Sequence, residues 1–215
     1  MKLLAACRLY TFVDTSYLRG RTPKLVAQQL CDGGSDLIQL RAKNLPYDEI
    51  RRMAEAILPI TRRAKVGFVI NDHLALAQEI GADLCHMGQE DFFDAGHVHV
   101  CQLRTPPRAG ATLRLGLSTH TPAQARRALD AGPDYIAIGP VYATPTKPNA
   151  KPVTLEYVRW AAANVKIPWF AIGGINLKTI DEVVAAGAKR VCIVSAILNA
   201  DDVAKACKEF KRRLR

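Results

Sequence analysis

Polar, charged or glycine residues recur in this chain wherever a short apolar run ends. The candidate set comprises Gln39, Arg41, Lys43, Asn71, Asp72, Asp91, Ser118, Thr144, Thr146, Lys147, Gly174 and Ser195, together with the apolar Val194 that precedes Ser195. Arginine, lysine and neutral hydroxyl donors bind phosphate, and one or two carboxylates beside a phosphate are the usual ligands of Mg²⁺. These residue types therefore indicate a site for phosphorylated substrates and a metal ion.

The loop from Gly139 to Lys147 concentrates this chemistry in the sequence Gly-Pro-Val-Tyr-Ala-Thr-Pro-Thr-Lys. Its two prolines restrict φ, which lowers the entropy that the loop loses when it closes on a ligand. Two hydroxyls and one compact positive charge suit an anion such as phosphate. Taken alone, the loop also fits a proline-rich surface turn.

Strand-length apolar runs alternate with segments of helical period along the whole chain. The expected strands are 9–13, 36–41, 67–70, 83–87, 113–117, 135–138, 168–172 and 190–194. The expected helices are 22–31, 47–63, 73–80, 122–131, 154–164, 177–186 and 201–213, with a short helix and a loop in the irregular segment 91–110. Eight strands in strict alternation with helical segments predict one α/β domain over 1–215, a single (β/α)8 TIM barrel. No G-x-G-x-x-G follows the first strand, so a dinucleotide site has no support.

A barrel places its chemistry at the carboxyl ends of its strands, with phosphate commonly bound after the seventh and eighth. Gly173-Gly174 permits close approach of backbone to a ligand, and the amides after Val194 and Ser195 could open a helix onto a phosphate. Asp72 and Asp91 lie among cations on the other side. We therefore expect a monophosphate near strands six to eight and a metal-bound polyphosphate near strands two to four.

Each candidate has a structural alternative. Asp72, Asp91 and Ser118 could cap helices, and Arg41 could form a salt bridge at the barrel mouth. His86 is better explained as a hydrogen-bonded wall residue, and the pair His97 and His99 lacks a third metal ligand. Purely structural roles become less plausible for the candidates as a group, because so many of them are expected at the same end of one barrel.

Composition narrows the function classes. The chain carries a formal charge of +10, which suits polyanionic small molecules, nucleic acid or an acidic membrane surface. Aromatic residues make up only 7% and are not interleaved with a basic run, so nucleic acid is disfavoured. The sequence contains no run of 18 apolar residues, so no membrane span is predicted. The six cysteines form no C-x-x-C pair. A cytoplasmic location is expected, and a homo-oligomer is compatible with the sequence.

The chain resembles the thiamine phosphate synthase family from its first strand to its last helix. The resemblance is carried by Gln39-Leu-Arg41-x-Lys43, Asn71-Asp72, His86-x-Gly-Gln89-Glu-Asp91, Gly116-x-Ser118-Thr-His-Thr, Gly139-Pro-Val-x-x-Thr144-x-Thr146-Lys147-Pro, Ala171-Ile-Gly-Gly174-Ile and Val194-Ser195-Ala-Ile. It implies that a hydroxymethylpyrimidine diphosphate and a thiazole phosphate (carboxylate) join to give thiamine phosphate and pyrophosphate, by a Mg²⁺-assisted dissociative substitution.

The resemblance also implies residue roles. The pyrimidine diphosphate would be bound by Gln39, Arg41, Lys43, Asn71, Ser118 and Lys147, with Arg41, Ser118 and Lys147 also catalytic. Mg²⁺ would be ligated by Asp72 and Asp91, and the thiazole phosphate held by Thr144, Thr146, Gly174, Val194 and Ser195. His73 and the segment 92–110 depart from the usual pattern. Two competing hypotheses are a thiazole tautomerase and a non-catalytic barrel that binds anions or RNA.

Overall fold

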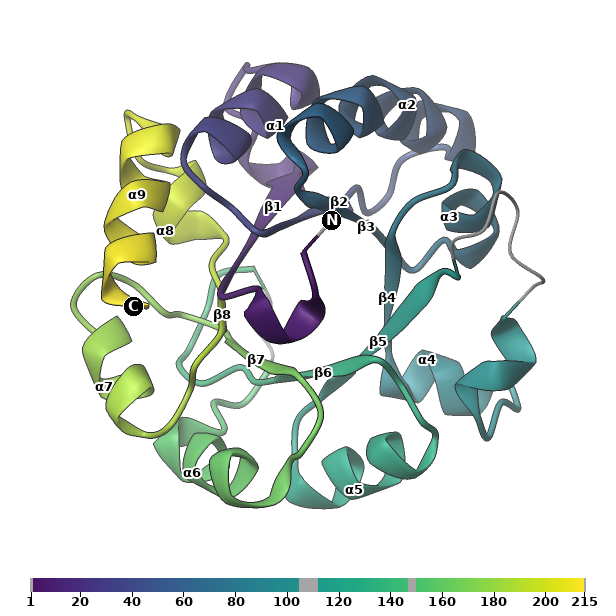
Figure 1. Ribbon diagram of the computed structural model, residues 1–215, viewed down its shortest axis with the longest axis vertical. Coiled ribbons are helices and arrows are strands. Elements are labelled where there is room, and N and C mark those ends of the chain that lie inside the picture. The colour runs from purple at the N-terminus through teal and green to yellow at the C-terminus, as the bar shows by residue number, and fades with distance from the viewer. Residues whose placement is uncertain (1, 105–111, 147–149, 215) are drawn as a thin grey trace.

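Eight parallel strands close into a barrel in sequence order within the part of the chain that the structure describes (Figure 1). The computed structural model describes residues 2–104, 112–146 and 150–214. The strands are β1 (Leu9–Asp14), β2 (Leu37–Arg41), β3 (Gly67–Asn71), β4 (Leu84–Gly88), β5 (Arg114–Thr119), β6 (Tyr135–Ile138), β7 (Trp169–Ile172) and β8 (Val191–Cys192). Pairing of β1 with β8 closes the ring, and the predicted TIM-barrel fold is confirmed.

Helices surround the barrel and cover the outer faces of its strands (Figure 1). They are α1 (Pro23–Asp32), α2 (Tyr47–Ala64), α3 (Leu74–Ile80), α4 (Gln89–Asp94), α5 (Pro122–Asp130), α6 (Thr154–Asn164), α7 (Ile180–Ala185), α8 (Ser195–Leu198) and α9 (Val203–Arg213). Short 3-10 turns are η1 (Leu4–Ala6), η2 (Thr15–Tyr17) and η3 (Val100–Leu103). No helix in the described ranges is long and apolar enough to cross a membrane.

The expected element bounds hold to within two residues, except at α4 and near the carboxyl end of the chain. Helix α4 begins at Gln89, before the irregular segment 91–110 in which a short helix was expected, and residues 105–111 of that segment lie outside the described residues. Helix α7 begins at Ile180 and not at residue 177, because Asn176 and Thr179 form a local turn. In that turn the amide of Lys178 donates to the Asn176 side chain, and the amide of Asn176 donates to the Thr179 hydroxyl. Such side-chain bonds compete with helix formation. Strand β8 is shorter than expected, and the short helix α8 follows it as an additional element.

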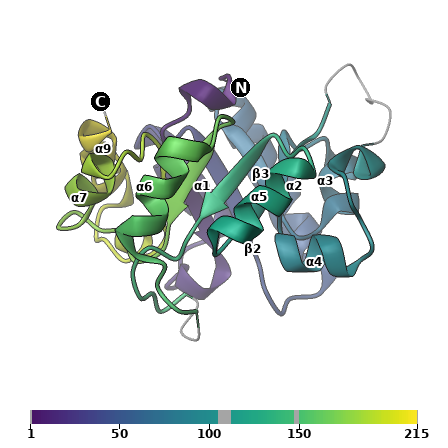
Figure 2. The ribbon, with the colours of Figure 1, turned by 90° about the horizontal axis from the view of Figure 1, so that it is seen from below.

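Large side chains fill the barrel interior. Tyr10, Phe12, Tyr135 and Phe170 pack there, and the two tyrosines are almost completely buried. The N-terminal turn η1 crosses the axis of the barrel in Figure 1 and contributes the buried Leu4. Figure 2 shows this turn at one end of the barrel, opposite the green segment that follows β6. The interior is therefore packed at the amino ends of the strands, and space for a ligand lies at their carboxyl ends.

Asp36, just before β2, fastens the closed end of the barrel. Its buried carboxylate accepts hydrogen bonds from the amides of Arg8 (2.8 Å) and Leu9 (3.1 Å) and forms ion pairs with Lys2 (2.8 Å) and with Lys211 on α9. Burial alone would raise the pKa of Asp36, but the hydrogen bonds from Lys2, Lys211 and the two amides outweigh it and lower the pKa. One carboxylate thus joins the N-terminal segment, β1 and the last helix.

Candidate active site

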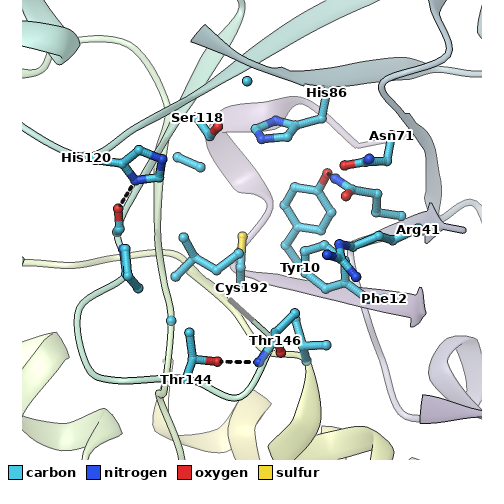
Figure 3. A pocket seen from close by; sticks show the side chains of 18 of the residues that line it. Tyr10, Phe12, Arg41, Asn71, His86, Ser118, His120, Thr144, Thr146 and Cys192 are labelled. Carbon is cyan, nitrogen blue, oxygen red and sulfur yellow. Dashed lines mark hydrogen bonds between the residues drawn. The ribbon is translucent and has the colours of Figure 1, made fainter. Parts of the chain in front are cut away.

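A cavity opens at the carboxyl ends of the strands and collects nearly all of the predicted site residues (Figure 3). Its lining includes Gln39, Arg41, Lys43, Asn71, Asp72, Asp91, Ser118, Thr144, Thr146, Gly174, Val194 and Ser195. Lys147, the remaining member of the predicted set, lies outside the described residues. Members of the predicted set that are up to 156 positions apart in sequence, Gln39 and Ser195, therefore face one space.

Strand β2 supplies Gln39 and Arg41 to one side of the cavity. The guanidinium of Arg41 donates from Nη1 to Oδ2 of Asp14 at 2.8 Å, and the Asp14 side chain is fully buried. Asp14 also accepts from the amide of Ser16 (3.0 Å), which fixes the carboxylate. The structural alternative for Arg41, a salt bridge at the barrel mouth, is thus present. A guanidinium has five N–H donors, so this bond still leaves others for a ligand.

The carboxylate of Asp72 lies beside Asn71 and Lys43 at the end of β3. Its Oδ2 accepts from Nδ2 of Asn71 at 2.5 Å and lies 3.6 Å from Nζ of Lys43. Asp72 has φ +63°, a left-handed conformation that is uncommon outside glycine and is often found at functional sites. The predicted alternative, a helix cap, is wrong, because α3 begins after His73 without any side-chain cap. Asp72 is therefore a partly exposed carboxylate held against the cavity.

Asp91 is placed by the first turn of α4, which follows β4 directly. Its carboxylate folds back over Gly88, where an added Cβ would come within 2.7 Å of Oδ2. Asp91 is the third residue of the helix and not its cap, and acidic groups in a first turn interact favourably with the helix dipole. Glycine at position 88 thus leaves room for a carboxylate that faces the cavity.

The loop after β6 is held against the end of β7. The amide of Val141 donates to the Ile172 carbonyl (2.8 Å), and that of Tyr142 donates to the Gly173 carbonyl (3.0 Å). A Cβ at Gly174 would come within 2.6 Å of the Ala143 carbonyl oxygen. The close approach of the two loops therefore requires glycine, and it presents Thr144 and Thr146 to the cavity (Figure 3).

Hydroxyl contacts order the same loop. The amide of Thr146 donates to the Thr144 hydroxyl at 3.3 Å, and Oγ1 of Thr146 lies 3.0 Å from the hydroxyl of Tyr17 in η2. Val194 and Ser195 complete this side at the start of α8. Because α8 spans only Ser195–Leu198, its dipole is small, and any contribution to anion binding comes from individual amides and the Ser195 hydroxyl.

Several lining residues lie outside the predicted set, among them Tyr10, Phe12, His120 and Cys192. Nδ1 of His120 contacts the Gly139 carbonyl oxygen at 2.5 Å, and since a carbonyl only accepts, this nitrogen carries the hydrogen. Burial raises the pKa of the Cys192 thiol well above its usual value, so it remains protonated and a poor nucleophile. Tyr10 and Phe12 were not predicted as lining residues, because the residues on both faces of β1 are apolar or neutral. The sequence therefore does not show which of them point into the barrel.

Figure 3 shows the lining residues in two groups. Arg41 and Asn71 lie on the β2–β3 side with Tyr10 and His86, and Thr144 and Thr146 lie across the cavity from Asn71. Ser118 lies at the end of β5 near His120. The site thus offers a cationic and amide-lined side with two carboxylates, and a hydroxyl-lined side built on the loops after β6, β7 and β8.

Proteins of one family are similar to this chain over most of its length. Residues 9–197 match the family described as thiamine monophosphate synthase. The thiamine-phosphate synthase of Thermus thermophilus is 43% identical over 185 residues, covering 85% of this chain and 84% of that protein. The enzyme of the same name from Acidothermus cellulolyticus is 39% identical over 213 residues, covering 98% and 96%. A solved thiamine phosphate pyrophosphorylase from Pyrococcus furiosus superposes with a TM-score of 0.81 at 26% identity, covering 99% of this chain and 98% of that one.

Proposed function

Since the chain belongs to the thiamine monophosphate synthase family, and is a transferase like its thiamine-phosphate synthase relatives, we propose that it joins an aminopyrimidine methyl diphosphate to a thiazole phosphate. The products are thiamine phosphate and pyrophosphate. The observation that carries this proposal is the division of one cavity into a cationic side and a hydroxyl-lined side, which suits two anionic substrates at once.

The reaction exchanges one bond for another at the pyrimidine methylene carbon. Its bond to the diphosphate oxygen breaks, and the electron pair leaves with pyrophosphate. The thiazole nitrogen then uses its lone pair to form the new C–N bond, which leaves the thiazolium cation of the product. The electron-rich aminopyrimidine ring stabilises the developing carbocation, so the substitution is dissociative. When the thiazole carries a carboxylate, that group departs as CO₂ and a proton takes its place.

On the cationic side the chain stabilises the departing charge. Arg41, held by Asp14, and Lys43, near Asp72, present positive charge to the leaving diphosphate, and Asn71 and Ser118 add neutral donors. Lys147 is proposed from sequence as a further cation. On the other side Thr144, Thr146, Gly174, Val194 and Ser195 hold the thiazole phosphate. No protein nucleophile is required, since positioning of the two substrates supplies most of the acceleration.

The two carboxylates fit a magnesium ion. Asp72 and Asp91 line the same cavity beside the cationic side chains. No group of three or more His, Cys, Asp or Glu that could hold a metal gathers among the described residues, in this cavity or outside it, so the protein would supply two carboxylates at most. Mg²⁺ is typically held by one or two carboxylates, with waters and substrate phosphates completing an octahedron. When bound, the ion would supply charge neutralisation for the diphosphate.

A coupled assay of pyrophosphate release tests the proposal. Release should require both substrates together with Mg²⁺, and omission of any one should reduce it to background. Lack of release under complete conditions would refute the synthase assignment. Isomerisation of a thiazole precursor without pyrophosphate release would favour the tautomerase, whereas binding of either anion without turnover would favour a non-catalytic barrel.

A further inference from the structure

The segment between β1 and α1 contacts the hydroxyl-lined side of the site from outside the cavity. It begins with η2 (Thr15–Tyr17) and includes Arg21. The hydroxyl of Tyr17 lies 3.0 Å from Oγ1 of Thr146 in the loop after β6. Thr146 lines the cavity (Figure 3), whereas Tyr17 is not among the lining residues. Tyr17 therefore contacts a predicted phosphate ligand without lining the cavity itself.

Arg21 fixes the position of Tyr17 relative to α8. Its Nη2 donates to the carbonyl oxygens of Tyr17 (2.9 Å) and Leu198 (2.6 Å), and its Nε donates to that of Leu18 (2.9 Å). Leu198 is the last residue of α8, and the carbonyls of a last helical turn have no partner within the helix. Because α8 begins at Ser195, which lines the cavity, one guanidinium joins Tyr17 to a second predicted phosphate-binding segment.

The number of hydrogens sets the direction of the bond between the two hydroxyls when a phosphate is bound. Each hydroxyl carries one hydrogen, and the oxygens of an ionised phosphate only accept. If Thr146 donates its hydrogen to the phosphate, its oxygen must accept the hydrogen of Tyr17. Successive hydroxyls that donate in one direction polarise each other, which strengthens each bond. The Tyr17 hydroxyl is thus placed to orient the Thr146 hydroxyl and to strengthen its bond to the phosphate.

We propose that Tyr17 is a positioning residue for the phosphate of the thiazole substrate, because its hydroxyl donates to Thr146 and directs the Thr146 hydrogen toward that phosphate. This inference rests on the proposed function, which assigns the thiazole phosphate to this side of the cavity. Tyr17 acts through Thr146, so it affects the binding of the thiazole phosphate and not the departure of pyrophosphate. On the cationic side, the contact of Asp14 with Arg41 does not involve the Tyr17 hydroxyl.

Steady-state kinetics of Tyr17→Phe test the role of the hydroxyl, since this variant keeps the ring. KM for the thiazole phosphate should rise by about five- to tenfold, with kcat and KM for the pyrimidine diphosphate changed by less than about twofold. Tyr142→Phe is the matched control, because the Tyr142 hydroxyl also joins the loop after β6 to a neighbouring element, through Glu182 (3.3 Å) on α7. It should keep KM for the thiazole phosphate within about twofold of the wild type. Equal effects of the two variants would refute a specific role of Tyr17.

Substitutions at Thr146 test whether Tyr17 acts through the Thr146 hydroxyl. Thr146→Val has nearly the same shape without the hydroxyl, so adding Tyr17→Phe to it should change the Kd for the thiazole phosphate by less than about twofold. Thr146→Ser retains the hydroxyl, and adding Tyr17→Phe to it should raise this Kd by about five- to tenfold. Isothermal titration calorimetry with the thiazole phosphate alone measures both effects without turnover. An equal effect of Tyr17→Phe in the two backgrounds would overturn the proposal.

The outcomes separate this proposal from the proposed function. Pyrophosphate release with an unchanged KM for the thiazole phosphate in Tyr17→Phe would refute the role of Tyr17 and leave the synthase assignment intact. Binding of the thiazole phosphate without pyrophosphate release would refute the synthase assignment, and calorimetry would still decide the role of Tyr17. A wild type that does not bind the thiazole phosphate would refute both.

Discussion

Replacement of Gly174 by alanine tests how the loop after β6 is held in the cavity. Gly174 has φ +65°, and an added Cβ would lie 2.6 Å from the Ala143 carbonyl oxygen and 2.7 Å from Cβ of Tyr142. Ordinary contacts begin near 3.4 Å, so the loop would have to move by about 0.8 Å. These neighbours are backbone or backbone-proximal atoms and cannot be relieved by a rotamer change. The movement would therefore reach Thr144 and Thr146.

The magnitude has two parts. The left-handed backbone costs alanine about 1 kcal/mol relative to glycine, and overpacking of this kind adds about 1–3 kcal/mol. Misplacement by about 1 Å can cost about 100-fold in rate, so we expect Gly174→Ala to lower kcat/KM for the thiazole phosphate by about 10- to 100-fold. KM for the pyrimidine diphosphate should change less than KM for the thiazole phosphate, since only Lys147 among its predicted ligands belongs to this loop in the sequence, and the others lie on or directly after β2, β3 and β5.

Gly34→Ala provides the matched control. Gly34 follows α1 with φ +85°, and an added Cβ there would meet nothing within 4 Å. Gly34→Ala should therefore lose about 1 kcal/mol in free energy of unfolding and retain full activity. Chemical denaturation and steady-state kinetics with each substrate varied in turn measure both effects. If Gly174→Ala matches Gly34→Ala in stability and keeps wild-type kinetics, the steric reasoning about the loop is refuted.

Three further perturbations probe the metal, the leaving group and the fold. Asp72→Asn should reduce Mg²⁺-dependent turnover by about 100-fold or more, and an unchanged Mg²⁺ titration of the rate would contradict its role as a ligand. Lys147→Ala, argued from sequence, should raise KM chiefly for the pyrimidine diphosphate, by about tenfold; a rise confined to the thiazole phosphate would show that the assignment is wrong. Asp36→Asn should lower the free energy of unfolding by about 2–4 kcal/mol at pH 7. Because the folded pKa of Asp36 is lowered, its contribution is complete above the unfolded pKa, near 4, and is lost as pH falls through the folded pKa. Denaturation curves should therefore converge for wild type and Asp36→Asn in acid, and a gap that persists at low pH would contradict this explanation.

The sequence predicted the barrel because its periodicity is locally encoded. Apolar runs in parallel strands and proline or threonine at helix starts are short-range signals, as at Thr22 and Thr121, whose hydroxyls cap α1 and α5. The start of α7 was missed because side-chain bonds in the Asn176–Thr179 turn compete with a pattern that otherwise reads as helix.

The sequence predicted those site residues that are polar and lie at the carboxyl ends of strands. In a closed parallel barrel those ends meet, so position alone brought Gln39, Asn71 and Ser118 to one cavity. The supporting residues were not predictable, because their roles depend on pairings between distant strands. Tyr135 reads as one more apolar strand residue, and its space comes from a glycine on a neighbouring strand, Gly116.

Arg41 shows why a salt bridge and a substrate contact need not be alternatives. An unpaired arginine at a cavity mouth has many rotamers, and ordering it on a ligand costs entropy. The buried carboxylate of Asp14 holds one edge of the guanidinium at 2.8 Å, and the amide of Ser16 holds the carboxylate in turn. The side-chain entropy of Arg41 is thus lost when the protein folds and not when the substrate binds. A guanidinium that is already ordered stabilises more effectively the negative charge that develops as the diphosphate leaves. The same contact that supported a purely structural interpretation of Arg41 is therefore a physical reason to expect that it acts on the leaving group.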